Sequence, residues 1–424
     1  MDSPPALERE LSVAVLIPAH NEAGIVGGVV RSVLRQTHRP AAVIVIADSC
    51  TDTTAQEAAA AGARVIVTSH ASKAANLNEG LALITTDLVV GIDGDTELAA
   101  DAIEHMVATI AAGYDGTCGA VLPHPSQPRT ATVRARSIEY ALARRLNRPA
   151  QSALGRLQVL SGAVFCYRVD AVRAIGGFPV DVPIGEDGEL TWRLQGAGYK
   201  LGFTRAAAAW TTEPETWGVY LAQVRRWAAS SAQILARHPR QLLHPARALI
   251  VGAWLFDLLG VSASFALALM LGIVNGPGAL AGISVITPIV AATSFALAAA
   301  ELGVRQALTC TPAAILAALL VRWVYIWALF RELVLGMHLV AWTGRQGRRA
   351  QLTPMTDRRR WTLTLLLGVT AAAAVPSLPW LAGAPLAAAA LALIVMAACA
   401  SQRTRGRHSL TAGQVPVEAL LEAR

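Results

Sequence analysis

A run of β-prone apolar residues at 89–92 ends in two aspartates, Asp93 and Asp95, that are separated by one glycine. This pattern is typical of a buried parallel strand that brings its last residues to the carboxyl edge of an α/β sheet, where ligands bind. Two carboxylates this close repel each other unless a cation lies between them, and Mg²⁺ or Mn²⁺ bridging to a diphosphate suits such a pair. The alternative is a loop in which the aspartates cap a turn or a helix.

The first part of the chain alternates between strand-like and helix-like segments. Apolar runs at 12–18, 42–48, 64–67 and 87–93 predict strands, and amphipathic segments between them predict helices. This alternation predicts a doubly wound α/β domain whose parallel strands all end at one edge. The polar residues at these strand ends should therefore converge there. They are the segment 18–22, Asp48, Asp93 and Asp95.

Asp48 is an acceptor suited to a base N–H or a ribose hydroxyl, although it could instead cap the helix that begins near Asp52. Further along, strands are expected at 117–123, 158–167 and 199–208, and helices at 99–112, 171–177 and 222–237. The segment 129–154 carries six arginines and is partly helical. This segment could cover the side of the site where an acceptor substrate binds, face anionic lipid or be a solvated helix face.

Three acids, Glu186, Asp187 and Glu189, open a helix. The helix dipole stabilises acids at this position, which is a purely structural explanation. The functional alternative is a general base that accepts the proton of an attacking hydroxyl group.

The later helix at 222–237 carries Gln223, Arg226 and Trp227. Gln223 and Arg226 are three residues apart and share one helix face, so both can reach one ligand. Arginine donates two hydrogen bonds to a diphosphate, and tryptophan stacks well on a sugar ring. The alternative is an interfacial helix that arginine and tryptophan anchor among lipid headgroups.

In this order the motifs resemble the family 2 glycosyltransferases, which are nucleotide-sugar enzymes with a Rossmann-like GT-A fold. The resemblance covers residues 12–230 and rests on Ile17-Pro18-Ala19-His20-Asn21-Glu22, Ala47-Asp48-Ser49-Cys50-Thr51-Asp52, Lys73-Ala74-Ala75-Asn76-Leu77-Asn78, Asp93-Gly94-Asp95, Glu186-Asp187 and Gln223-x-x-Arg226-Trp227. The last motif is similar to the signature of cellulose, chitin, hyaluronan and poly-N-acetylglucosamine synthases, and some members that glycosylate lipids share it.

The resemblance implies a role for each matching position. Asp187 would be the catalytic base, Glu186 would orient it or the acceptor, Asp95 would ligate Mg²⁺ or Mn²⁺, and Trp227 would line the acceptor end. The nucleotide-sugar contacts would come from Pro18, Ala19, Asn21, Glu22, Asp48, Lys73, Asp93, Gln223 and Arg226. The family often has threonine on both sides of its acidic pair. Here the neighbours are Gly185 and Gly188, which leaves open how rigidly Asp187 is held.

The expected function is inverting transfer of a sugar, with a UDP-sugar favoured as donor, to a growing polysaccharide or other glycan. One alternative is transfer of a single sugar to a lipid or lipid-linked acceptor. A lesser alternative, from another class, is a non-catalytic membrane scaffold with a degenerate GT-A fold.

The composition also predicts a membrane protein. Hydrophobic residues make up 54% of the 424-residue chain and the mean hydropathy is +0.45, which is too apolar for a purely soluble protein. The net charge of +7 is partly a topology signal, and the basic residues lack the interleaved aromatics of a nucleic-acid groove. The five cysteines have no paired spacing, which is typical of reduced residues in a cytoplasmic domain and membrane helices.

We therefore expect a cytoplasmic GT-A domain at 1–245 and an α-helical transmembrane region at 246–424 of a multi-pass protein of the cell membrane. Apolar stretches at 248–273, 280–300, 361–381 and 385–400 predict four spans. A fifth stretch at 312–342 contains ionisable residues and is expected to be interfacial or re-entrant. Its ionisable residues are Arg322, Arg331, Glu332 and His338.

Arginine-rich loops at 343–360 and 403–407 should be cytoplasmic by the positive-inside rule. A cysteine at position 348 (Arg348→Cys), in a chain whose native cysteines are replaced by serine, should react with a membrane-impermeant maleimide only after the cells are permeabilised. Asn275→Cys, between the first two stretches, is the matched control and should react in intact cells. Labelling at position 348 in intact cells would contradict this topology.

Overall fold

The computed structural model describes residues 11–260, 286–339 and 352–353. Its centre is an eight-stranded sheet with the order β3-β2-β1-β4-β7-β6-β8-β5. The strands are β1 (Val13–Ala19), β2 (Ala42–Asp48), β3 (Arg64–Thr68), β4 (Leu88–Ile92), β5 (Thr96–Leu98), β6 (Gly116–Pro123), β7 (Val164–Arg168) and β8 (Leu201–Thr211). A second pair, β9 (His338–Leu339) and β10 (Leu352–Thr353), lies apart from this sheet.

The first four strands are parallel, as predicted, but the whole sheet is mixed. β7 is antiparallel to both β4 and β6, and β5 is antiparallel to β8. The parallel arrangement predicted from the first four strands therefore does not extend to β7, and β5 was not predicted. β7 begins beside the end of β4, where the Asp93 amide donates to the Ala163 carbonyl at 3.2 Å, and therefore runs back along β4 in the opposite direction.

Both faces of the sheet are buried under helices, which explains why β1 is apolar at successive positions. Val13, Val15 and Ile17 belong to one core cluster, and Ala14 and Leu16 to another. The first cluster includes residues of α1 (Val26–Leu34) and α4 (Ala102–Ala111). The second includes residues of α3 (Lys73–Ala82), α7 (Val169–Ala174) and α8 (Glu186–Gly196). A further helix, α2 (Thr54–Ala60), packs beside α1.

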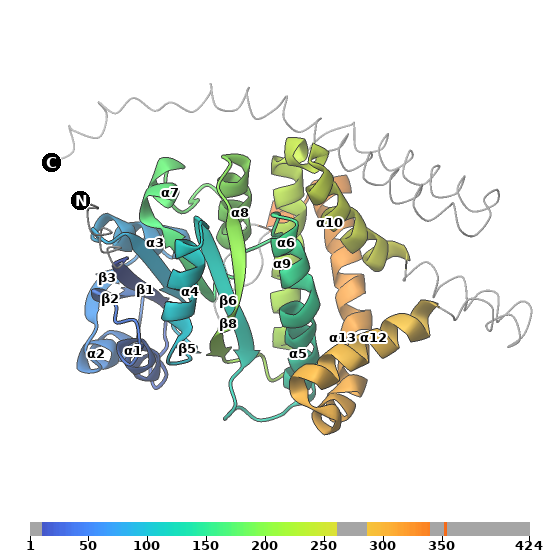
Figure 1. Cartoon of the computed structure of the whole chain (residues 1–424), viewed down its shortest axis with the longest axis horizontal. Helices are drawn as coiled ribbons and strands as arrows, with labels where there is room; N and C mark the ends of the chain where they lie inside the picture. Colours follow the sequence, from blue (N-terminus) through green and yellow to red (C-terminus); the bar gives the residue numbers. More distant parts are fainter. Residues whose placement is uncertain (1–10, 261–285, 340–351, 354–424) are drawn as a thin grey trace, which may run out of the picture.

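Beyond the sheet, a layer of long helices begins (Figure 1). α5 (Ala131–Leu142) continues through a π-helical turn, η1 (Ala143–Asn147), into α6 (Arg148–Ala153). α9 (Trp217–Arg237) lies next to α5, and α13 (Val304–Leu329) packs against both helices. Their shared apolar cluster consists of Ala135, Tyr220, Val224 and Ala317, with partly buried neighbours. This layer therefore joins the sheet domain to the apolar C-terminal helices.

Several arginines of the basic segment 129–154 make structural contacts. Arg144 and Arg145 form ion pairs of 2.5 and 2.7 Å with Glu301, at the end of α12 (Ile286–Leu302), and Arg205 of β8 reaches the same carboxylate at 3.1 Å. These contacts tie α12 to η1 and the sheet. Arg136 is fully buried, and Arg134 is exposed. A uniformly solvated helix face is therefore excluded.

The predicted membrane stretches are described in part. α10 (Pro245–Leu255) and η3 (Phe256–Gly260) follow the short turn η2 (Pro239–Leu243) and begin the stretch 248–273, and α12 overlaps the stretch 280–300. The stretches 361–381 and 385–400 lie outside the described residues.

The stretch 312–342 falls largely on α13 and the π-helical turn η5 (Phe330–Val334). Within the part of the chain that the structure describes, Val304–Val334 is the one helix long and apolar enough to cross a membrane, by length and composition. The interfacial or re-entrant placement of this stretch stays a prediction, and so do the four spans.

Candidate functional site

A cavity of about 1120 Å³ opens at the carboxyl edge of the sheet. Its walls come from the ends of β1, β2 and β4, the first turn of α8, and one face of α9. These are the places where the sequence predicted polar groups to converge. The predicted residues that line it are Pro18, Ala19, Glu22, Asp48, Lys73, Asp93, Asp95, Glu186, Asp187, Gln223, Arg226 and Trp227.

Asn21 alone among the predicted site residues is not in the cavity wall. Its backbone has a φ of 54°, and its side-chain oxygen accepts a hydrogen bond of 2.8 Å from the Thr51 amide. Nearby, the Glu22 amide donates to the Thr54 hydroxyl at 2.8 Å. These contacts hold the loop after β1 against the loop after β2. Asn21 therefore shapes the site from behind.

Asp48 is almost completely buried at the end of β2. Its carboxylate accepts hydrogen bonds from the Asn76 amide at 2.9 Å and from the Ala71 backbone N–H at 3.2 Å. Burial raises the pKa of this carboxyl, but the donors, led by Asn76, outweigh burial and hold the pKa below its ordinary value. The helix that follows begins at Thr54, whose amide donates to Asp52, so Asp48 is not a helix cap. It remains an ionised acceptor in the cavity wall.

Lys73, at the start of α3, lies between two carboxylates. Its ammonium forms a short ion pair with Asp93, donates to the Gly162 carbonyl at 3.0 Å and lies 3.8 Å from Glu186. Burial would lower the pKa of Lys73, but the charges of Asp93 and Glu186 outweigh it and raise the pKa above its ordinary value. The predicted cation is therefore present and charged.

Asp95 faces a group of hydroxyls at the start of β5 and the end of β8. Its Oδ1 lies 3.4 Å from both the Thr96 and Thr211 hydroxyl oxygens. The helix that follows, α4, begins only at Ala102, so neither Asp93 nor Asp95 is a helix cap.

In the described ranges no cluster of three or more His, Cys, Asp or Glu side chains could hold a metal ion. Mg²⁺ is commonly held by one or two carboxylates together with substrate phosphates. Asp95 in an open cavity fits that shared mode and does not fit an all-protein metal site.

Glu186 and Asp187 lie in the first turn of α8 and line the cavity. The Asp187 carboxylate accepts hydrogen bonds from the Gly162 amide at 3.1 Å and the Gly188 amide at 2.8 Å. Burial raises the pKa of Glu186 above its ordinary value. The positive charge of Lys73 opposes this increase, and the negative charge of Asp187 adds to it. The two acids therefore lie in different surroundings, since Asp187 accepts backbone N–H groups and Glu186 lies 3.8 Å from the Lys73 ammonium.

Gly185 answers the question of how firmly this turn is held. Its φ is 73°, and a Cβ built there would lie 1.6 Å from the Ser230 hydroxyl oxygen on α9. A side chain at this position would separate the two helices. Glycine therefore allows α8 to start directly against α9, and Asp187 is held by backbone amides in place of threonine neighbours.

α9 begins at Trp217, five residues earlier than predicted, and presents the Gln-x-x-Arg-Trp motif to the cavity. Arg136 of α5 donates to the Gln223 side-chain oxygen at 2.6 Å, and its guanidinium lies 4.5 Å from the centre of the Trp227 ring. The alternative, a helix anchored among lipid headgroups, does not explain these contacts, because the motif faces protein and cavity.

Residues 10–230 match the model of the glycosyltransferase-like family 2. The chain belongs to this family. Poly-β-1,6-N-acetyl-D-glucosamine synthases of Staphylococcus aureus and Staphylococcus epidermidis are each 26% identical to it over 232 residues. Each match covers 53% of this chain and 56% of the relative, so the chain spans about half the length of these relatives.

Among solved structures, a Pyrobaculum calidifontis mannosyltransferase in complex with GDP-mannose and Mn²⁺ matches with a TM-score of 0.52. The two chains are 20% identical, and the match covers 77% of this chain and 88% of the other. This likeness confirms the predicted GT-A fold of the sheet domain.

Several residues of the site were given no role from the sequence. Asn76 and Gly162 hold Asp48, Lys73 and Asp187 through the contacts described above, and Arg136 reaches Gln223. Glu213 follows β8 and also lines the cavity, so the strand-end pattern could have found it. Arg136 had no such signal, because nothing in a basic helix marks which arginine is buried.

The third acid of the α8 cluster has a separate, structural role. Glu189 is buried and pairs with His238 at 3.0 Å and Arg193 at 2.9 Å. Burial raises the pKa of Glu189, but His238 and Arg193 outweigh it and lower the pKa to about 2, from an ordinary 4.5. Its ionisation therefore stabilises the fold fully above pH 4.5, and this stabilisation is lost as the pH falls toward 2.

Glu189→Gln should lower the free energy of unfolding at pH 7 by on the order of 3 kcal/mol, because the buried carboxylate and its partly exposed partners Arg193 and His238 lose their charged contacts. The variant should also lose less stability than the wild type on acidification. Thermal unfolding in detergent, followed by tryptophan fluorescence at several pH values, measures both effects. The exposed Glu79→Gln is the control, and equal melting temperatures for the two variants would contradict the prediction.

Proposed function

We propose that this chain is an inverting glycosyltransferase of the cell membrane that transfers a sugar from a nucleotide sugar, with a UDP-sugar favoured, to a glycan acceptor. The relatives that it matches are named as synthases of a β-1,6-linked N-acetylglucosamine polymer, which supports a growing polysaccharide as acceptor. The donor is made in the cytosol, so the catalytic domain faces the cytoplasm of a multi-pass protein.

One observation carries the proposal. One cavity is lined by four groups: the buried hydrogen-bond acceptor Asp48, the aspartates after β4, the carboxylate of Asp187, and the face of α9 that carries Gln223 and Trp227. These are the groups that bind a nucleoside, hold a diphosphate, take a proton and contact a sugar. A scaffold with a degenerate fold would have no use for all four, so the arrangement supports catalysis.

The chemistry needs one proton acceptor beside the donor sugar. The acceptor hydroxyl oxygen attacks the anomeric carbon, the bond from that carbon to the diphosphate oxygen breaks, and the configuration inverts. Asp187 takes the hydroxyl proton in this step. Its two backbone hydrogen bonds leave further lone pairs for the hydroxyl group.

The leaving group is an anionic nucleoside diphosphate, and cations around it favour its departure. Arg226 and Gln223 line the cavity from α9 and would donate hydrogen bonds to it, and Lys73 would add positive charge from α3. Asp95 would hold Mg²⁺ or Mn²⁺ together with the diphosphate oxygens, and the bound ion would neutralise part of the developing charge. Asp48 and the segment 18–22 would hold the nucleoside.

Transfer to a lipid or lipid-linked acceptor is the second candidate. The cavity reaches beyond the sheet to Val251 and Trp254 of α10 and to Tyr325 of α13. Trp254 and Tyr325 meet edge to face with ring centres 5.7 Å apart. An apolar acceptor could enter between these helices, so the product and not the fold decides between the two candidates.

Membranes that contain the protein should hydrolyse or transfer at least one sugar from a panel of UDP- and GDP-linked sugars with Mn²⁺. Asp187→Asn should lower the rate of transfer by roughly 10²- to 10⁴-fold, because the base is lost. The exposed Asp170→Asn, outside the cavity, is the matched control and should keep the wild-type rate.

The size of the radiolabelled product separates a polymer from a glycolipid. Inactivity of the wild type toward every nucleotide sugar tested, UDP- and GDP-linked, would contradict the proposed function. An Asp187→Asn variant as active as Asp170→Asn would contradict the assigned base.

A further inference from the structure

Arg136 is a fully buried arginine in a helix that otherwise carries its charge near the surface. Arg134, two positions before it on the same helix, is exposed, whereas no part of the Arg136 side chain reaches solvent. Burying a guanidinium is costly unless its charge and its five N–H groups find partners. The partners that it contacts therefore indicate what it does.

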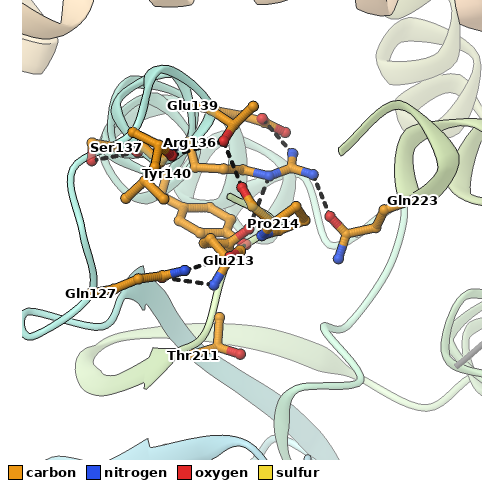
Figure 2. A network of polar contacts seen from close by, with 12 residues as sticks. Gln127, Arg136, Ser137, Glu139, Tyr140, Thr211, Glu213, Pro214 and Gln223 are labelled. Carbon is orange, nitrogen blue, oxygen red and sulfur yellow. Dashed lines mark hydrogen bonds and ion pairs between the residues drawn. The ribbon is translucent and has the colours of Figure 1, made fainter. Parts of the chain in front are cut away.

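Its contacts join three elements of the fold (Figure 2). Nε donates to Glu213 at the end of β8 at 3.1 Å, and Nη1 to Glu139 of α5 at 2.6 Å. Nη2 donates to the side-chain oxygen of Gln223 on α9 at 2.6 Å. Glu213 is itself held by the Tyr140 hydroxyl at 2.5 Å. The guanidinium thus connects the sheet edge to the cavity-facing helix.

The direction of the Gln223 amide follows from this contact. A guanidinium can only donate hydrogen bonds, so the amide must turn its oxygen toward Arg136 and its NH₂ group away. Figure 2 shows the oxygen toward Arg136 and the nitrogen on the other side. Gln223 lines the cavity, and among the described residues its nitrogen has no hydrogen-bond partner. The amide therefore offers two N–H donors to a ligand.

The same guanidinium also fixes the neighbouring ring. It lies 4.4 Å from the centre of the Tyr220 ring and 4.5 Å from that of Trp227. Cation–π contacts at this distance orient a ring as well as stabilise it. Trp227 has one face turned to the cation and also lines the cavity. Arg136 therefore holds the first and last residues of the motif, although it does not itself line the cavity.

We infer that Arg136 is a positioning residue. It orients the Gln223 side chain so that its N–H groups face the donor diphosphate, and it holds the Trp227 ring at the cavity wall. The inference rests on the proposed function, because it needs an anionic donor in the cavity. Lysine cannot substitute, since its single ammonium lacks the planar fork that reaches Glu213 and Gln223 together and stacks between two rings. Glu213 and Glu139 neutralise the charge, so its geometry and not a free positive charge matters.

The first test is the affinity for UDP, and in parallel GDP, with Mn²⁺, measured by calorimetry on the purified full chain in detergent. Gln223→Glu keeps an oxygen for Arg136, so the arginine stays paired, but it has no N–H group to offer the diphosphate and its added charge repels it. It should bind the nucleotide roughly tenfold or more weakly. Wild-type affinity in this variant would overturn the inference.

A double-mutant cycle separates positioning from general destabilisation. Arg136→Lys should weaken nucleotide binding roughly tenfold in the wild-type background and less than about twofold in the Gln223→Ala background, because there is no amide left to orient. If Arg136→Lys weakens nucleotide binding by the same factor in both backgrounds, its role is merely structural and the inference is overturned. Arg134→Lys is the matched control and should bind the nucleotide as the wild type does.

Two failures are distinguishable in this design. If the wild type binds neither UDP nor GDP, the proposed function falls and this inference falls with it. If the wild type binds one of them and the variants behave in either of the contradicting ways, the inference alone is wrong. Should Arg136→Lys not fold, Gln223→Glu still decides, since it leaves the buried arginine paired.

Discussion

Negative charge is crowded at the carboxyl edge of the sheet, and the other parts of the site are arranged around its compensation. Carboxylates that share a cavity of low dielectric repel one another strongly. Asp48 is stabilised by amide and hydroxyl donors, Asp93 and Glu186 share the ammonium of Lys73, and Asp187 accepts two backbone N–H groups. The donors come from different segments, so this charge pattern exists only when α3, β7 and α8 have docked on the sheet. Assembly of the fold and formation of the site are therefore the same event.

The parallel half of the sheet could be predicted because its signals are local. The strands β1 to β4 are apolar runs that end in polar residues, and short helices separate them. The direction of β7 could not be predicted, because an apolar run has the same pattern in either direction and about forty residues separate it from β6. β5 has three residues, Thr96–Leu98, which is too short for any periodicity to appear. Its pairing with β8 depends on contacts more than a hundred residues apart.

The same distinction applies to the site. Asp48 ends a strand, Asp93 follows one and Asp187 lies at the start of a helix, so position along the chain marks them. Arg136 is marked by distant partners such as Glu213 and Gln223, which lie 77 and 87 residues away. A pattern in one helix cannot reveal such partners. Sequence patterns therefore found the groups assigned to the chemistry, and the structure was needed for the groups that hold them.

α9 carries the connection between the site and the apolar helices. One face of this helix lines the cavity with Gln223 and Trp227, and Ser230 lies where a side chain at Gly185 would be. Its buried Tyr220 and Val224 pack with Ala317 of α13. Because α8 and α13 both rest on α9, the orientation of Asp187 relative to α13 is set by packing and not by a flexible linker. The far end of the cavity, at Trp254 and Tyr325, therefore opens beside α13 whether that helix crosses the bilayer or lies along it.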